Sequence, residues 1–97
     1  MIIRIVKMTF QQEKVSDFLL LFEEVKNKIA SFNGCHHLEL WQEHEKENVL
    51  FTYSIWENEN ALNHYRFSEL FKTTWSRTKV LFADKPEAWS LNRLQNV

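Results

Sequence analysis

The stretch that most constrains the fold is residues 49–56, VLFTYSIW. It contains no Gly, Pro or charged residue, and its β-branched and aromatic content favours a strand. Side chains alternate along a strand. One face therefore carries Val49, Phe51, Tyr53 and Ile55, and the other carries Leu50, Thr52, Ser54 and Trp56. Both faces need covering, so the pattern predicts a central strand with another layer packed on each side.

The aromatic content is high for a chain of this size. Its 97 residues are enough for one domain, and we expect residues 1–97 to form it. Four Trp, eight Phe and two Tyr are more aromatic surface than one small core readily hides. The excess predicts an oligomer interface, an apolar ligand pocket, or both.

Charge and cysteine content exclude several classes of protein. Twelve Lys and Arg against 13 Asp and Glu, with no basic run, argue against a nucleic-acid partner. The single cysteine, Cys35, excludes an intrachain disulfide and fits a cytoplasmic location. No apolar run is long enough to span a membrane, and Arg4 and Lys7 interrupt the N-terminal apolar stretch, unlike a signal peptide. We expect a soluble cytoplasmic protein without a membrane partner.

The first half of the chain predicts a strand, a helix and a second strand. Residues 2–10 read as a strand, and residues 13–32 repeat at helical spacing. The predicted buried face of this helix consists of Val15, Phe18, Leu19, Phe22, Val25, Ile29 and Phe32. Gly34 suits the left-handed position that ends a helix. Residues 35–44 then alternate, with Leu38, Leu40 and Gln42 on one face and Cys35, His37, Glu39 and Trp41 on the other.

The second half predicts a hairpin, a kinked helix and a last strand. A polar tetrad at 45–48 makes a short hairpin loop before the central strand. Asn58 is a good N-cap for a helix from about residue 59, and Ser68 restarts this helix after a kink. Its predicted buried side consists of Ala61, Leu62, Tyr65, Leu70, Phe71, Trp75, Thr78 and Phe82. Pro86 opens the last strand, at about 87–94.

The resulting order, β-α-β-β-α-β, predicts an α+β fold of the ferredoxin-like type. Right-handed crossovers give a four-stranded antiparallel sheet with both helices on one face. The other face would expose the apolar side chains Ile3, Ile5, Trp41, Phe51, Tyr53 and Ile55. Such a patch marks an interface. We therefore predict a homodimer in which two sheets pack face to face through Phe51, Tyr53 and Ile55.

Over nearly its whole length the chain resembles the antibiotic biosynthesis monooxygenase (ABM) family of dimeric α/β barrels. The matching residues are Gly34-Cys35-His36, Trp56-Glu57, Ala61-Leu62, His64 and Ser68-Glu69-Leu70-Phe71. The resemblance implies a dimeric barrel. The family includes cofactor-independent oxygenases of polyketide phenols, quinol oxygenases, haem-degrading enzymes and many members of unknown activity, and the resemblance implies that this chain belongs among them.

The haem-degrading branch of the family fits this chain poorly. Where that branch has a histidine iron ligand on the second helix, this sequence aligns Trp75, and Trp cannot replace an imidazole at iron. Val6 stands in place of an Asn and Tyr65 in place of a Trp. We therefore expect no haem.

The polyketide-oxygenase branch fits in part. Its Trp at the end of the third strand matches Trp56. Thr52 stands where that branch has Asn, Gln42 where it has His, and Phe71 where it has Arg. The resemblance therefore implies a pocket of similar shape with different polar groups.

The candidate site lies on the mixed face of the central strand, under the second helix. Oxygenation without a metal needs an electron-rich ring held in a dry, apolar cavity with a hydrogen-bond partner for its phenol. The predicted catalytic residues are Trp56 and His64. The predicted substrate-binding residues are Thr52, Gln42, Ser54, Tyr65, Phe71 and Trp75. The expected substrates are O2 and a phenolic, quinol or polyketide-like small aromatic molecule, with no cofactor.

Structural roles compete with these assignments. Trp56 is equally well a core side chain with its N–H on a backbone carbonyl, and His64 is more often a half-exposed helix residue. A dimeric protein that binds a small molecule without turnover is the alternative function. A metal site is not expected. His36 and His37 point to opposite faces, and His36 lies roughly 26 Å from His44 at the rise of a strand.

Overall fold

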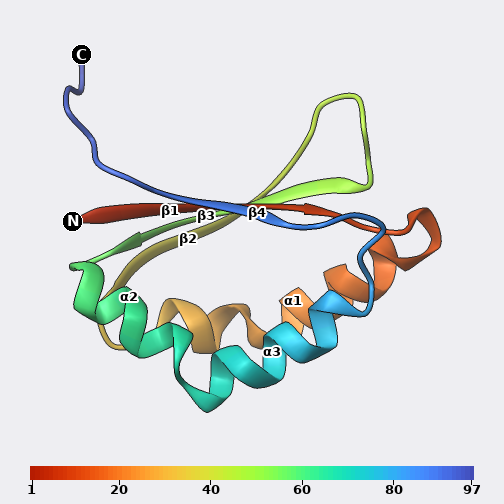
Figure 1. Cartoon of the computed structure of the whole chain (residues 1–97), viewed down its shortest axis with the longest axis horizontal. Helices are drawn as coiled ribbons and strands as arrows, with labels where there is room; N and C mark the ends of the chain where they lie inside the picture. The colour runs from red at the N-terminus through yellow and green to blue at the C-terminus, as the bar shows by residue number, and fades with distance from the viewer.

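A computed structural model describes residues 1–97 as a four-stranded antiparallel sheet with helices on one face (Figure 1). The elements are β1 (Ile2–Thr9), a 3₁₀ turn η1 (Gln12–Lys14), α1 (Val15–Ala30), β2 (Cys35–Gln42), β3 (Val49–Trp56), α2 (Glu59–Arg66), α3 (Glu69–Lys79) and β4 (Glu87–Leu91). The strands lie in the order β2-β3-β1-β4. The predicted ferredoxin-like fold is confirmed.

β3 is a central strand, as its sequence predicted. Ser54 on β3 lies opposite Arg4 on β1 and opposite Leu38 on β2. Partners directly across a sheet project to the same face, so this row of three side chains points toward the helices. Trp56, at the end of the strand, is only 1 % exposed.

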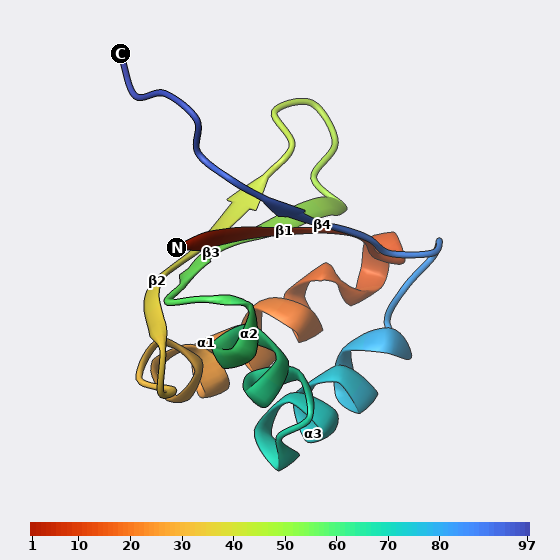
Figure 2. The ribbon, with the colours of Figure 1, turned by 60° about the vertical axis from the view of Figure 1, so that its left-hand side comes forward.

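The two faces of the sheet have different surroundings. In two views, α1, α2 and α3 all lie on one side of the sheet, whereas the β2–β3 loop and the C-terminal tail extend to the other side (Figures 1 and 2). The core therefore forms between the sheet and the helices, and it includes Met8, Phe10, Phe18, Leu50, Trp56 and Leu62.

α1 buries a face slightly different from the predicted one. Phe18, Val25 and Ile29 are buried as predicted, but Leu19 is 44 % exposed, and Leu21 is buried in its place. The prediction for Leu19 is wrong because helical spacing shows only how wide the apolar face of a helix is. The rotation of the helix about its axis, which decides which edge of that face is buried, is set by packing against the sheet. Leu19 and Leu21 lie on opposite edges of that face.

The turn after α1 depends on Gly34. This residue has φ +89°, the left-handed conformation predicted for it. Its carbonyl oxygen accepts a hydrogen bond of 2.8 Å from the N–H of Glu57. The bond joins the start of β2 to the connection between β3 and α2, directly beside Trp56.

The predicted caps and kink in the second helical stretch are confirmed. Asn58 Oδ1 accepts a hydrogen bond from the N–H of Ala61 at 2.8 Å. Ser68 ends one helix and begins the next, because its hydroxyl donates to the carbonyl of Tyr65 at 2.6 Å and accepts from the N–H of Phe71 at 3.1 Å. Ser68 thereby fixes Tyr65 and Phe71 relative to each other.

β2 departs from strict alternation at its start. The register shifts between Cys35, which lies opposite Trp56, and His37, which lies opposite Ile55. This β-bulge places Cys35 against the core, and burial raises the pKa of its thiol. The prediction that Cys35 shares the outward face with His37 is therefore wrong. β2 and β4 also end earlier than predicted, at Gln42 and Leu91.

Candidate functional site

A cavity of about 370 Å³ lies between the sheet and the helices. Its walls come from β1, β2, β3, the three helices and the start of β4, and they are mostly hydrophobic. This volume is within the range of small-molecule binding sites. The cavity is therefore the strongest candidate for a functional site.

One wall of the cavity is a continuous series of aromatic rings. Trp56 stacks on Tyr65 with ring centroids 4.8 Å apart, and Tyr65 meets the edge of Phe71 at 5.3 Å. Phe71 in turn stacks on Trp75 at 5.8 Å. These rings come from β3, α2 and α3, and together they offer flat surfaces on which a planar ligand can stack.

Two hydroxyl side chains of β3 line the same cavity. Ser54 Oγ accepts a hydrogen bond of 2.9 Å from Trp56 Nε1, so the partner of the indole N–H is a side chain and not the predicted backbone carbonyl. Thr52, two residues earlier on the same face, also lines the cavity. Its hydroxyl is available to donate to a ligand oxygen or to accept from a ligand donor.

Tyr65 supplies a phenol in this apolar setting. It is 9 % exposed. Burial, and secondarily the nearby Cys35 thiol, raise the pKa of Tyr65 well above the ordinary value for tyrosine. Tyr65 is therefore a neutral hydrogen-bond donor at physiological pH and not a base.

Two arginines also line the cavity. Arg4 comes from β1 and Arg66 from the last turn of α2. Arg4 Nη1 donates a hydrogen bond of 2.9 Å to Ser90 Oγ on β4. Partial burial, together with the positive charge of Arg66, lowers the pKa of Arg4. The two guanidinium groups therefore repel each other at one end of the cavity.

The structure brings together six of the eight residues predicted for the site. The cavity is lined by Thr52, Ser54, Trp56, Tyr65, Phe71 and Trp75. Gln42 lies outside it, where its Nε2 donates to the carbonyl of Glu47 at 2.9 Å and closes the hairpin.

His64 also lies outside the cavity. It is exposed on α2 and borders a separate hollow with Gly34 and Glu57, and its ring lies 6.0 Å from that of Phe32. The expectation that it faces the pocket is wrong because Leu62 and Tyr65 form the buried side of α2, which turns His64 outward.

Sequence reasoning missed Arg4 and Arg66 as cavity residues. Arg4 had a visible signal, because it shares its strand face with Val6 and Met8, where a charge is unexpected. Arg66 had none, since the end of a helix is an ordinary place for a cation.

No group of three or more His, Cys, Asp or Glu side chains comes together in a way that could hold a metal ion. Two of the four histidines instead form separate pairs with carboxylates, His36 with Glu57 and His37 with Glu39. None of the helices has the length and apolar character needed to cross a membrane.

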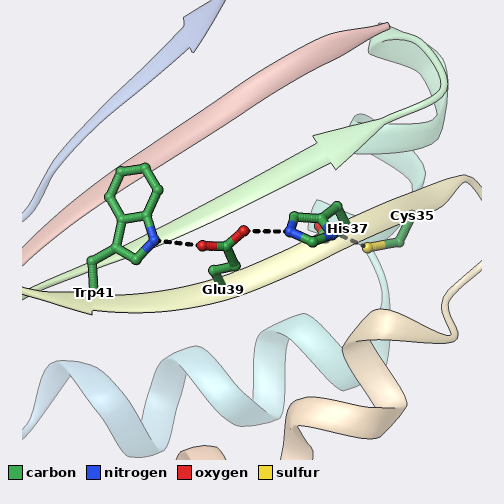
Figure 3. Close-up of polar contacts among 4 residues, drawn as sticks. All are labelled: Cys35, His37, Glu39 and Trp41. Atoms are coloured by element: carbon green, nitrogen blue, oxygen red, sulfur yellow. Dashed lines mark hydrogen bonds and ion pairs between the residues drawn. The ribbon is translucent and has the colours of Figure 1, made fainter.

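The outward face of β2 carries a connected polar row (Figure 3). Trp41 Nε1 donates to Glu39 at 2.8 Å, and the other carboxylate oxygen of Glu39 pairs with His37. These hydrogen bonds lower the pKa of Glu39, and the bond from Trp41 has the larger effect. The indole of Trp41 also stacks on Tyr53 of β3, with centroids 4.8 Å apart.

The same sheet face exposes more apolar surface than the sequence reading included. Trp41 is 42 % exposed, and β4 adds Trp89 at 41 % and Leu91 at 47 %. Trp89 lies opposite Ile5 of β1. The predicted apolar face thus extends across all four strands.

Comparison with known proteins supports one family. Residues 1–76 match the family model described as antibiotic biosynthesis monooxygenase. Comparison with curated protein sequences gave no match.

Solved structures of the same fold agree. One is a crystal structure of an antibiotic biosynthesis monooxygenase, with TM-score 0.91 and 15% identity over 98% of this chain and 100% of that one. A conserved protein from Methanosarcina mazei Go1 has TM-score 0.88 and 24% identity over 95% and 92% of the two chains. Rv0793 from Mycobacterium tuberculosis has TM-score 0.89 and 15% identity over 98% and 96%. At these identities the structures show a shared fold, and the family match extends over most of the sequence. The chain therefore belongs to the antibiotic biosynthesis monooxygenase family.

Proposed function

We propose that the protein is a cofactor-independent monooxygenase of a phenolic, quinol or polyketide-like small aromatic molecule. The observation that carries the proposal is the cavity of about 370 Å³ walled by Trp56, Tyr65, Phe71 and Trp75. A planar ring stacks well on such surfaces, and the low polarity keeps water from a reactive intermediate. The family match supports oxygenation as the reaction type.

The reaction balances without a cofactor when the substrate is a phenol or an anthrone. A ring CH2 or an aromatic C–H para to the phenol becomes a carbonyl, one oxygen atom of O2 enters the substrate, and the other leaves as water. The substrate supplies all four electrons that reduce O2. An electron-rich anion is the form that gives the first of these electrons, so the site must hold a phenolate or enolate.

The residues of the cavity would bind the ring and form a hydrogen bond to the substrate oxygen. Phe71 and Trp75, which are less buried than Trp56, hold the ring by stacking, and the neutral hydroxyl of Tyr65 or that of Thr52 donates to the substrate oxygen. No His or Lys lines the cavity. The substrate proton is therefore lost to water rather than to a buried base, because Glu87 lies on the outward face of the sheet, and His64 takes no part.

Oxygen uptake with a panel of quinols and hydroxyanthrones tests the proposal. We expect one O2 consumed per substrate, one labelled oxygen atom in the product, and no dependence on added metal or flavin. Tyr65→Phe removes one donor and should lower kcat/KM about tenfold or more. His64→Ala is the matched control on the same helix and should leave the rate unchanged. A rate that falls only in His64→Ala contradicts the proposed site.

A second function, binding of a small aromatic molecule without turnover, is favoured by the lack of a buried base. It predicts that the same compounds quench tryptophan fluorescence while no oxygen is consumed. Haem degradation predicts a Soret band on addition of haem, and we expect none.

We also propose that the protein is a homodimer that packs through the outward sheet face. Phe51, Tyr53 and Ile55 are central to this face, and exposed Trp41 and Trp89 flank them. A two-fold axis would cover the same patch on both subunits. Each subunit would be the single domain of residues 1–97. The free thiol of Cys35 supports a cytoplasmic location for the protein.

A further inference from the structure

Two cations border a mostly apolar cavity. Arg4 projects from β1 on the face that points to the helices, next to Val6 on the same side of the strand. Arg66 ends α2 and is exposed to solvent, whereas Arg4 is half-buried. The pair therefore lies where the apolar interior of the cavity meets water.

Neither cation has an acidic partner. The five ion pairs of the structure involve Lys14, Lys26, His36, His37 and Arg77. Glu87 is the only acidic residue that lines the cavity, but it lies opposite Lys7, on the outward face of the sheet. The hydrogen bond to Ser90 uses one Nη of Arg4 and neutralises no charge. Most of the five N–H donors of a guanidinium thus remain for a ligand.

Ordinary structural roles account for only one of the two arginines. A cation at the C-terminal end of a helix interacts favourably with the helix dipole, which explains Arg66. Arg4 has no such explanation, because an apolar side chain beside Val6 would pack against the helices without the cost of burying charge. Two unneutralised cations that border one cavity disfavour the empty protein and favour a bound anion.

We propose that the aromatic ligand carries a carboxylate, which Arg4 and Arg66 bind at the mouth of the cavity while the ring stacks on the less buried part of the aromatic wall, at Phe71 and Trp75. This inference rests on the proposed function, and it names the substrate class as aromatic acids. A carboxylate matches the planar fork of a guanidinium and accepts two parallel hydrogen bonds from it. Charge at the mouth would also fix which end of the ring enters first.

Binding of hydroxynaphthoate and of its methyl ester, measured by quenching of tryptophan fluorescence under nitrogen, tests the proposal. The two probes share a ring and differ in charge. We expect the acid to bind at least about tenfold more tightly than the ester, and Arg4→Met or Arg66→Met to remove that preference. Arg77→Met is the matched control, because Arg77 pairs with Glu24 and does not line the cavity. It should leave the preference intact.

Further measurements separate this proposal from loss of fold and from other anions. Raising NaCl from about 0.05 M to about 0.5 M should weaken binding of the acid and leave that of the ester unchanged. Arg4→Met should also melt at the same or a higher temperature than the parent, since it removes a half-buried charge. Equal binding of acid and ester by the parent protein, or tighter binding of naphthyl phosphate than of the acid, would overturn the carboxylate assignment.

Oxygen uptake separates the two proposals. Selective binding of the acid without oxygen consumption contradicts the monooxygenase and leaves the anion site standing. Turnover of neutral quinols as fast as of their carboxylated analogues contradicts the anion site and leaves the monooxygenase standing.

Discussion

The indole N–H of Trp56 donates to the hydroxyl of Ser54, two residues earlier on the same face of β3, at 2.9 Å. Ser54 is 7 % exposed and Trp56 is 1 % exposed. The bond therefore satisfies a polar atom that water cannot reach and holds the indole flat beneath Tyr65. Through this bond, a small residue of β3 sets the orientation of one of the two indoles that line the cavity.

Ser54→Ala should lower the free energy of unfolding by about 1–3 kcal/mol, because it leaves the buried indole N–H without a partner. Urea denaturation measures the loss. The control is the same substitution in a Trp56→Phe protein, which has no indole N–H to leave unpaired. In that protein Ser54→Ala should lower the free energy of unfolding clearly less. An equal loss in both backgrounds would mean that the hydroxyl acts through packing and not through this bond.

Gly34→Ala should destabilise the protein by about 2 kcal/mol or more. A side chain at φ +89° is strained, and the added Cβ would lie 2.5 Å from Cβ of Ala61. Introducing Ala61→Gly removes that close contact but not the backbone strain, so it should recover only part of the loss that Gly34→Ala causes. Thermal melts of the four proteins in this cycle check the expectation, and full recovery would contradict the role of the positive φ.

The stability of the protein should fall in alkali partly through Tyr65. Its pKa is raised in the folded chain, so the folded protein keeps the phenolic proton longer than the unfolded chain does. Stability from this group is complete below about pH 10, the ordinary tyrosine value, and declines above it by up to about 1.4 kcal/mol per pH unit. Tyr65→Phe should show a shallower decline when urea midpoints are compared from neutral to alkaline pH. Parallel declines in the two proteins would refute this.

Tyr53→Glu should convert the proposed dimer into monomers. Tyr53 lies between Trp41 and His37 on the outward sheet face, and a two-fold axis near it would bring two carboxylates together in an apolar interface. We expect at least about a hundredfold weaker association in sedimentation velocity. Leu20→Glu places the same charge on a leucine of α1 that is 72 % exposed, and it should leave the dimer unchanged. A parent protein that is monomeric at high concentration would remove the basis for this surface.

The sequence predicted the sheet and its covered face because each strand and helix carries its own hydrophobic period. VLFTYSIW at 49–56 and the caps at Asn58 and Ser68 are local signals, and the structure agrees with them. The positions of Leu19 and His64 were wrong for a related reason. Period defines a helix face, but the rotation of the helix comes from what it packs against.

Other features of the site have no local signal. The bulge at Cys35 is a choice of backbone register, and nothing in residues 35–37 specifies it. Gln42 was placed on the correct face of its strand but at the hairpin end, beyond the cavity. The meeting of Arg4 with Arg66 joins residues that are far apart in the chain, so only the assembled fold reveals it.

The strand that borders the mouth of the cavity is the least anchored part of the sheet. β4 has five residues, all of them exposed, and it pairs only with β1. Short edge elements of this kind open locally at lower free energy than the core strands do. Fraying of β4 would widen the passage beside Arg4 without disturbing the aromatic wall, so ligand exchange would depend on the local opening of one strand while the rest of the sheet stays paired.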